Sequence, residues 1–393
     1  MLYIKNIKLN NFRCFKSLNL EFKPKVNILI GNNGAGKTSV VEGISYLCLG
    51  KSFRGAKDKE VLKINESYFN VISNINYSNS ENKVVVSYDG ANKRVKCDEV
   101  ICKTLSEYVG KYKLISFSPD DLDIIKGGPS FRRRFIDLFI SQCDNNYLKL
   151  VVEYKKVLKM RNEFLKSIKN QQYDKILFDV ITENIIKYGK LIISIREKYI
   201  SVLNSYVKAI SKELSNGKEI IEIAYSPNID INAYENTVKK YIGYDISSKT
   251  TNFGPHKDNL KVSLSGNDAS SYASQGQCRL AILSMKLAVY EVFSKIDDNI
   301  IIVLDDVFSE LDQNRQKYLL EYINKTGQVF ITTTDIYKLP DDLIKESNIV
   351  EIREGECNGW YEWKCKKWTR IRKSHCEHTY GKEKCDTRRI WCL

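Results

Sequence analysis

Residues 31–38, GNNGAGKT, fit the pattern G-x-x-x-x-G-K-[ST] and could hold a nucleotide phosphate. The glycines accept backbone conformations that a Cβ would block, so consecutive N–H groups can face inward. Lys37 would reach the β- and γ-phosphates, and the Thr38 hydroxyl would ligate Mg²⁺. We expect the nucleotide to be contacted by Gly31, Asn32, Asn33, Gly34, Ala35, Gly36, Lys37, Thr38 and Ser39.

Two adjacent acids far along the chain could complete this site. Residues 299–306, NIIIVLDD, are an apolar run that ends in Asp305 and Asp306, as a central parallel strand would. Asp305 would hold Mg²⁺, and Asp306 would orient or deprotonate the attacking water. By itself the pattern also fits two solvated acids at a strand end. With the upstream loop it predicts an ATP and Mg²⁺ site, in which Lys37 and Asp306 are catalytic.

The elements that must position these residues can be predicted from periodicity. Residues 26–30 are an apolar run that leads directly into the loop, and a helix with one apolar face follows over 40–47. Apolar and polar residues alternate over residues 2–22, and residues 67–118 contain further strand-like sequence. Both features predict a β-rich N-terminal part. The second half of the chain repeats the α/β pattern, with strands near 260–264, 299–306 and 327–335 and a helix over 279–293.

The middle of the chain has a different character. No proline lies between positions 129 and 227, and apolar residues recur every seven positions at 151, 158 and 165. We predict two or three long helices, which form either a short antiparallel coiled arm or an ordinary helical bundle. The interpretation is one α/β ATPase domain, residues 1–130 and 245–352, split by a helical lobe of residues 131–244.

Composition bounds the cellular setting. The 393 residues contain no apolar run of the roughly 20 residues that a membrane helix needs. The N-terminus lacks the apolar core of a signal peptide, so we expect a soluble cytoplasmic protein that holds its eleven cysteines as reduced thiols. The net charge of +14 indicates a polyanionic partner.

Residues 353–393 differ abruptly from the rest. They hold five of the eleven cysteines, all four tryptophans and two of the three histidines. We interpret them as an atypical tail, non-native or disordered. A zinc site built from Cys365, Cys376, His378 and Cys385 is a weaker alternative, because no C-x₂-C pair is present. Without this tail the chain still carries 51 basic and 42 acidic residues, so the polyanion prediction stands.

Three further stretches resemble the motifs of ABC-type ATPases. YASQGQCRL (272–280) resembles the signature motif, with Ser274, Gly276 and Gln277 at its key positions. FSELD (308–312) resembles the D-loop, which contributes Asp312, and ITTTD (331–335) stands at the H-switch with Thr334 in place of histidine. The resemblance implies that two ATPs are sandwiched in a dimer, each between the phosphate loop of one subunit and the signature serine of the other.

Over residues 1–350 the chain resembles the bacterial RecF family. The motifs, in the family's order, are LNNFRCF (9–15), GNNGAGKT, FSPDDLDIIKGGPSFRRRFID (117–137), GPHKDNL (254–260), SQGQCR (274–279) and LDDVFSELD (304–312). The resemblance implies an SMC-like ATPase head with a short helical arm, in which Arg13 lies near the nucleotide. Lys257 and Asn259 depart from the arginine and aspartate expected of the family, and lysine loses bidentate hydrogen bonding.

The RecF resemblance also implies a function. We expect ATP-dependent dimerisation on double-stranded DNA and on single/double-strand junctions at gaps, with single-stranded DNA as a further ligand. A weak, DNA-stimulated ATPase would act as a switch, and RecR with RecO would be partners in loading the recombinase. The alternative is a generic ABC-type ATPase, either a transporter subunit or an SMC-like structural protein. The inserted lobe and the absence of long coiled-coil sequence disfavour it.

The sequence allows more than one role for each of two basic motifs. Arg132, Arg133 and Arg134 are consecutive, so they cannot share one helix face. They fit a DNA phosphate contact, a link between lobes or a solvated helix face. His256 in GPHKD fits either the nucleotide site, including its border with the helical lobe, or a turn after Pro255.

Overall fold

The computed structural model describes residues 2–77, 80–168, 173–297 and 299–353. Within them the prediction of an α/β ATPase head with a β-rich N-terminal part and a helical insert is confirmed. The predictions for residues 354–393, including the zinc alternative, lie outside the described residues. Among the described helices, none combines the length and the apolar character that crossing a membrane requires.

The N-terminal part is an antiparallel sheet. Its strands alternate buried and exposed residues, as expected for a sheet with one face on a core. The main path runs β3-β2-β5-β6-β7-β8, and β1 pairs with β5. The strand bounds are β1 Tyr3–Ile4, β2 Asn6–Phe12, β3 Phe15–Glu21, β5 Phe69–Tyr77, β6 Ser80–Tyr88, β7 Lys93–Cys97 and β8 Val100–Ile101.

A second, parallel sheet forms the centre of the molecule. Its order is β15-β4-β14-β13-β9, so β14 lies between β4 and β13. All six residues of β13 and of β14 are buried, because helices cover both faces. The bounds are β4 Lys25–Ile30, β9 Lys113–Phe117, β13 Ile300–Asp305, β14 Gln328–Thr333 and β15 Asn348–Glu351.

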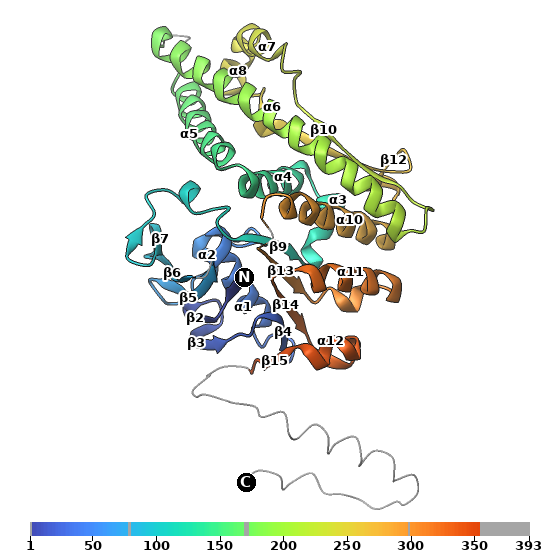
Figure 1. Cartoon of the computed structure of the whole chain (residues 1–393). Coiled ribbons are helices and arrows are strands. Elements are labelled where there is room, and N and C mark those ends of the chain that lie inside the picture. The colour runs from blue at the N-terminus through green and yellow to red at the C-terminus, as the bar shows by residue number, and fades with distance from the viewer. Residues whose placement is uncertain (1, 78–79, 169–172, 298, 354–393) are drawn as a thin grey trace, which may run out of the picture. The chain divides into compact units, whose positions relative to one another are not determined.

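Helix α1 (Lys37–Leu49) packs between the two sheets (Figure 1). Alternate residues of β13 divide between two apolar clusters: Ile301 and Val303 face the α1 side, and Ile300 and Ile302 face the opposite side. On the opposite side lies α10 (Gln275–Ser294), which packs on β9 and β13. The parallel sheet is therefore the layer that joins the phosphate-loop helix to the helix that begins at Ser274.

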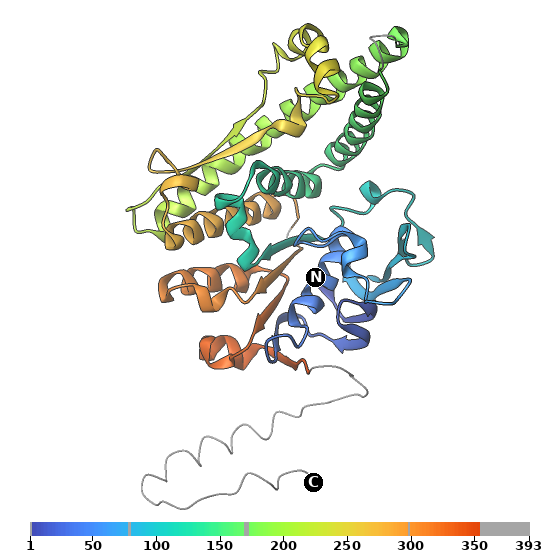
Figure 2. The same cartoon turned by 180° about the vertical axis from the view of Figure 1, so that it is seen from behind.

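The helical insert follows β9. Figures 1 and 2 show two long helices, α5 and α6, running side by side, with a small sheet of β10, β11 and β12 along α6. Helix α6 also packs against α10. The bounds are α3 Leu122–Lys126, α4 Pro129–Cys143, α5 Asn145–Ser167, α6 Lys175–Leu214, β10 Ile221–Ser226, α7 Tyr234–Lys240, α8 Ile242–Ser248, β11 Asn259–Leu264, β12 Asn267–Asp268 and α9 Ala269–Tyr272.

Of the remaining α-helices in the described residues, two are short and α11 has 13 residues. They are α2 Asp58–Val61, α11 Gln313–Lys325 and α12 Asp341–Glu346.

Strand β10 lies inside the predicted insert and pairs antiparallel with β11, which lies beyond the predicted end of the insert at residue 244. Pairing across that boundary ties the two parts together, and the domain division itself stays a prediction.

A buried arginine holds the base of the insert. Arg196 on α6 is 4% exposed and binds Asp137 of α4 at 2.9 Å and Asp258 at 2.9 Å. Its guanidinium also donates to the Tyr147 hydroxyl and to the Pro255 carbonyl, both at 2.8 Å. Burial acts to raise the pKa of Asp137, but the charges of Arg196 and Lys155, together with the hydrogen bonds from Tyr147 and Arg196, outweigh burial and hold that pKa below its usual range.

We expect Arg196→Ala to destabilise the protein by about 3–5 kcal/mol, because two buried carboxylates would lose their partner. Urea unfolding measures the change in the free energy of unfolding. The matched control is Lys239→Ala, which removes the exposed pair with Glu235 and should leave that free energy nearly unchanged. Equal effects of the two substitutions would contradict the assigned role of Arg196.

The Arg196–Asp137 ion pair also predicts that the free energy of unfolding depends on pH. Since the folded-state pKa of Asp137 is depressed, its ion pair contributes stability above the unfolded pKa. That contribution is lost as the pH falls through the folded value. Arg196→Ala should therefore flatten the acid limb of a plot of unfolding free energy against pH, and an unchanged slope would argue against the pair.

Candidate nucleotide-binding site

The phosphate loop joins β4 to α1. Gly34 and Gly36 have φ of 84° and 101°, in the left-handed region that favours glycine. A Cβ on Gly36 would come within 2.4 Å of the Phe15 ring and 2.8 Å of Cys14 Sγ, so only glycine fits beside the β2–β3 turn. Gly36 is also the N-cap of α1 and supplies no side-chain cap. The first-turn N–H groups of α1 are thus left for an anion.

The first turn of α1 and the carboxyl ends of β13 and β14 bring the predicted magnesium ligands together. The Thr38 hydroxyl donates to Asp305 Oδ1 at 2.9 Å, although the two residues are 267 positions apart. The Thr332 hydroxyl donates to the same oxygen at 2.7 Å and accepts from the Asp306 N–H at 3.0 Å. The register of β13 and β14, which pairs Asp305 with Thr332, makes this contact possible. Sequence reasoning missed Thr332, although it stands in the ITTTD stretch.

Asp306 leaves the strand at this point. Its φ is 56°, a left-handed conformation that aspartate tolerates better than most residues. The side chain is exposed, and the Ser309 hydroxyl donates to its carbonyl at 3.0 Å. Asp305 therefore lies buried at the end of the sheet, while Asp306 faces solvent beside it.

The charges of this centre are poorly solvated. Burial lowers the pKa of Lys37, against the attraction of Asp306 and Asp305. Burial likewise raises the pKa of Asp305, although hydrogen bonds from Thr332 and Thr38 oppose the shift. The Lys37 ammonium donates to the Gly31 and Asn32 carbonyls, both at 2.8 Å. An ammonium held by neutral carbonyls would gain from a phosphate, and a buried carboxylate would gain from a cation.

The residues present fit ATP and Mg²⁺. A hydroxyl and a carboxylate at 2.9 Å are the hard oxygen ligands that Mg²⁺ prefers. Thr38 and Asp305 would hold the ion, which would neutralise charge on the phosphates and their leaving group. The uncapped start of α1 and Lys37 would hold the phosphates themselves.

Arg13 is bound to α1, the helix that follows the phosphate loop. It adopts φ of 56° and pairs bidentately with Glu42 of α1, at 2.7 and 2.8 Å. Its third contact is to the Glu60 carbonyl, at 2.9 Å. The hydrogen bond with Glu42 raises the pKa of Arg13 above its ordinary value. Burial opposes this rise but does not cancel it. A nucleotide contact by Arg13 stays a prediction.

The signature residues form a separate group at the start of α10. Ser274 is the N-cap: its hydroxyl accepts from the Gln277 N–H at 3.3 Å, and Gln277 Oε1 accepts from the Ser274 N–H at 2.9 Å. Gly276 is exposed, and a Cβ there would meet nothing within 4 Å. This helix start is ordered yet open, as a site that receives a ligand from outside would be.

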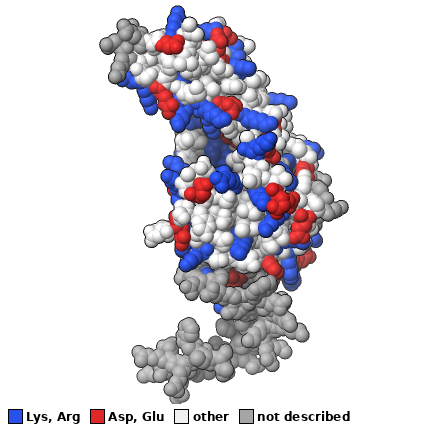
Figure 3. Space-filling model, turned by 90° about the vertical axis from the view of Figure 1, so that its left-hand side faces the viewer, with Lys and Arg blue, Asp and Glu red and all other residues white. Residues whose placement is uncertain are grey.

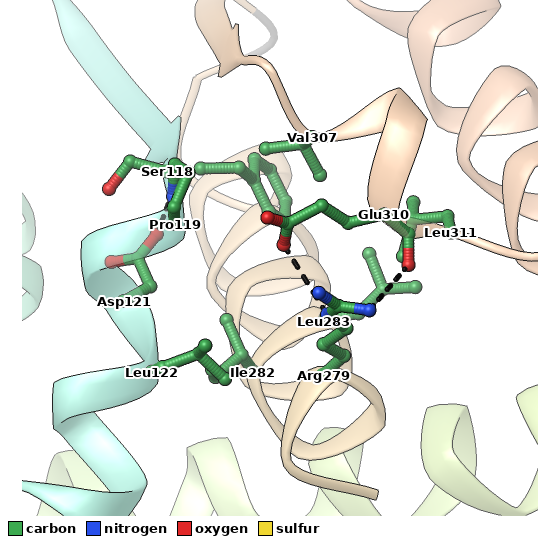
Figure 4. A pocket seen from close by; sticks show the side chains of 11 residues that line it. Ser118, Pro119, Asp121, Leu122, Arg279, Ile282, Leu283, Val307, Glu310 and Leu311 are labelled. Atoms are coloured by element: carbon green, nitrogen blue, oxygen red, sulfur yellow. Dashed lines mark hydrogen bonds and ion pairs between the residues drawn. The ribbon is translucent and has the colours of Figure 1, made fainter. Parts of the chain in front are cut away.

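The D-loop is tied to the signature helix by two arginines. Arg315 pairs with Asp312 at 3.2 Å and donates to the Gly276 carbonyl at 3.1 Å. Arg279 pairs with Glu310 at 3.3 Å across a small pocket, which Figure 4 shows beside Ser118 and Val307. No hydrogen bond or ion pair found among the described residues joins this group to Thr38 or Asp305. Thr334 is exposed beyond β14.

The consecutive arginines act as links within the chain. Arg132 donates to the Gly127 carbonyl at 2.8 Å and to Asn259 Oδ1 at 2.7 Å. Arg133 donates to the Asp258 carbonyl at 2.9 Å, and Arg134 donates to the Ser52 and Phe53 carbonyls. Of the three interpretations left open, the structure therefore favours a link between lobes.

His256 lies in the insert. One ring nitrogen contacts the Tyr154 hydroxyl at 2.6 Å, and the other contacts the Thr251 carbonyl at 2.9 Å. Burial lowers its pKa to about 4, so the ring is neutral at physiological pH. These contacts fit the interpretation that His256 shapes the turn after Pro255.

The phosphate loop, the paired acids and the signature helix on a split α/β core define a P-loop ATPase head of the SMC type. The family model described as RecF/RecN/SMC N terminal domain matches residues 3–341. Proteins called DNA replication and repair protein RecF are similar over 90% of this chain and 98% of their own. The one from Lachnoclostridium phytofermentans is 37% identical, and the one from Geobacillus sp. (strain WCH70) is 34% identical.

The chain belongs to the RecF family. A solved structure described as the recombination mediator protein RecF-ATP in the RecFOR pathway is similar, with 34% identity and a TM-score of 0.83, over 90% of this chain and 96% of that chain. The family assignment made from the six sequence motifs is thus confirmed.

We expect Lys37→Ala to abolish ATP binding, because the phosphates would lose their only charged partner from the loop. Isothermal titration with ATP and Mg²⁺ measures it. The control is Lys345→Ala on α12, whose side chain is 73% exposed and pairs with Asp342. ATP affinity of the Lys37 variant close to that of the unchanged protein would contradict the assignment.

Proposed function

We propose that this protein is an ATP-dependent DNA-binding protein of recombinational gap repair and replication restart. ATP binding drives dimerisation on DNA, and slow hydrolysis releases the dimer. The protein assists recombinase loading together with RecO and RecR, and it works in the cytoplasm at the nucleoid. The family supports this proposal, since solved relatives are described as bound to ATP and as members of the RecFOR pathway.

One observation carries the dimer proposal. The Lys37–Thr38–Asp305 centre and the Ser274 helix start are two incomplete halves: the first holds the groups for phosphate and metal, and the second presents an open helix N-terminus with an exposed glycine. A second copy of the chain would place its Ser274, Gly276 and Gln277 on the phosphates. Asp312 would arrive with them, because Arg315 ties the D-loop to Gly276.

Within that closed site each residue has a distinct task. Lys37 would bind the β- and γ-phosphates, and Thr38 and Asp305 would hold Mg²⁺. Asp306 accepts a proton from, or orients, the attacking water, which its exposed position beside Asp305 allows. Because the helix dipole and the Ser274 hydroxyl come from the partner copy, hydrolysis would depend on dimerisation.

A basic hollow supports DNA as the polyanion. Figure 3 shows Lys and Arg side chains around a hollow between the helical insert and the N-terminal part. The half-buried Lys51 lies among Lys155, Arg134 and Lys93. Burial lowers its pKa to about 8; the charge of Asp137 opposes this shift, and the three cations add to it. Clustered cations with one partly buried member favour a phosphate backbone, whose charge would relieve the repulsion.

We expect Asp306→Asn to bind ATP but to hydrolyse it at least about 100-fold more slowly, because the water would lose its carboxylate. The dimer should then persist. Phosphate release under saturating ATP gives the rate, and titration with a fluorescent ATP analogue checks binding. Normal turnover would remove Asp306 from the catalytic role.

Ser274→Arg tests the proposed function most simply. The bulky cation should leave ATP binding to the monomer intact and block the ATP-dependent dimer. Sedimentation velocity with and without ATP measures the oligomeric state. Ser270→Arg, on the short helix before the motif, is the matched control and should still dimerise. An ATP-dependent dimer of the Ser274 variant would contradict the sandwich.

The DNA proposal predicts that Lys155→Glu weakens binding to double-stranded DNA. The slope of log K against log salt should fall by about one unit for each phosphate contact that is lost. Fluorescence anisotropy across salt measures both quantities, with Lys345→Glu on α12 as the control. Equal affinities and slopes for the two variants would place DNA elsewhere. Stimulation of ATP hydrolysis by DNA at low salt is the accompanying expectation.

A further inference from the structure

Two cysteines lie side by side on the β7–β8 hairpin at the edge of the N-terminal sheet. Cys97 pairs with Val100, and the Cys102 N–H donates to the Val95 carbonyl at 2.9 Å. Because side chains alternate across a strand, this register places Cys97 and Cys102 on one face, in diagonal positions. Cys102 is the ionisable group that acts most strongly on Cys97, and both side chains pack against the apolar cluster around α1.

The surroundings of this pair include an unsatisfied donor. Tyr112 is fully buried, and its hydroxyl has no hydrogen-bond partner among the described residues. Cys97 is its strongest electrostatic neighbour, and the Lys111 ammonium also acts on Cys97. A buried hydroxyl without a partner costs free energy, and no contact among the described residues offsets that cost.

We propose that Cys97 and Cys102 form a redox-active dithiol, a site of reversible oxidation whose substrate is a low-molecular-weight disulfide such as oxidised glutathione. One thiol loses its proton and attacks the external disulfide, which releases one small thiolate and leaves a mixed disulfide. The second thiol loses its proton and displaces the other small thiolate. The protein gains one S–S bond and loses two electrons and two protons, and the external disulfide becomes two thiols.

The local structure suits an internal disulfide. Both cysteines are half-buried, so each side chain keeps some access to solvent. Strand β8 has only two residues, and Val100 and Ile101 are 70% and 60% exposed. A short edge strand with little packing can shift by the amount that a diagonal pair needs to reach disulfide geometry.

The protonation state of the thiols also fits a disulfide that forms slowly and is then stable. Burial raises the pKa of Cys97 to about 11, and the neighbouring Cys102 adds to the effect. The thiolate fraction at neutral pH is small, so the reaction is slow, while the product buries no charge. Such transient intracellular disulfides are usually redox-sensing, which matches a chain whose other thiols we expect to stay reduced.

The sequence allows a direct test on the full-length protein. Trypsin cleaves after Lys96 and Lys103, so both cysteines fall in one peptide, CDEVICK (97–103). Reduced protein is exposed to oxidised glutathione while folded, quenched in acid, alkylated and digested. We expect this peptide without alkyl groups and about 2 Da lighter than its reduced form, and full recovery of the reduced peptide after dithiothreitol.

The single variants supply the controls. Cys97→Ser and Cys102→Ser should each give a free thiol or a glutathione adduct and no internal disulfide. Cys14, the exposed cysteine near the phosphate loop, reports how far the oxidant has acted. The proposal is overturned if the 97–103 peptide stays alkylated at both cysteines while Cys14 is converted. It is equally overturned if either cysteine is found bonded to another cysteine of the chain. Neither result depends on ATP binding or dimerisation.

Discussion

The structure depends on one contact, the meeting of Thr38 with Asp305 at the end of the parallel sheet. The strand order places β14 between β4 and β13, and the phosphate loop and the acid pair leave the sheet at the same edge. Thr332 on the intervening strand binds both acids, its hydroxyl to the Asp305 carboxylate and to the Asp306 N–H. The fold thus brings two distant motifs together in one centre, whose oxygen atoms fit Mg²⁺.

That centre carries charges that the protein alone does not fully satisfy. Lys37 is held by carbonyls, and Asp305 is buried. Burial lowers the pKa of Lys37 and raises the pKa of Asp305, so it favours the neutral form of each. A phosphate and a divalent cation would reverse both shifts, so ligand binding would be favoured by relief of the desolvation cost. The same reasoning applies to the signature helix, whose capped but open first turn carries no acidic residue of its own.

Much of this could be predicted from sequence, because the motifs have local causes. The phosphate loop, its flanking strand and helix, and the acid pair follow from glycine spacing and apolar runs. The contacts that tie elements together could not be predicted. Thr332 acts through a register that no local pattern reveals, Arg13 through a pairing with Glu42, and the three arginines through carbonyls of distant turns. The β10–β11 pairing across the predicted lobe boundary is of the same kind.

The central claim is that one ATP site needs two chains. It is tested most directly by mixing the Lys37→Ala and Ser274→Arg variants and measuring ATP hydrolysis. Each variant alone should be inactive. A mixed dimer has one intact site, which joins the phosphate loop of the Ser274 variant to the signature helix of the Lys37 variant. We predict that mixing restores a substantial fraction of the activity of the unchanged protein. Activity that stays at the level of the separate variants, although mixed dimers form, would contradict the account.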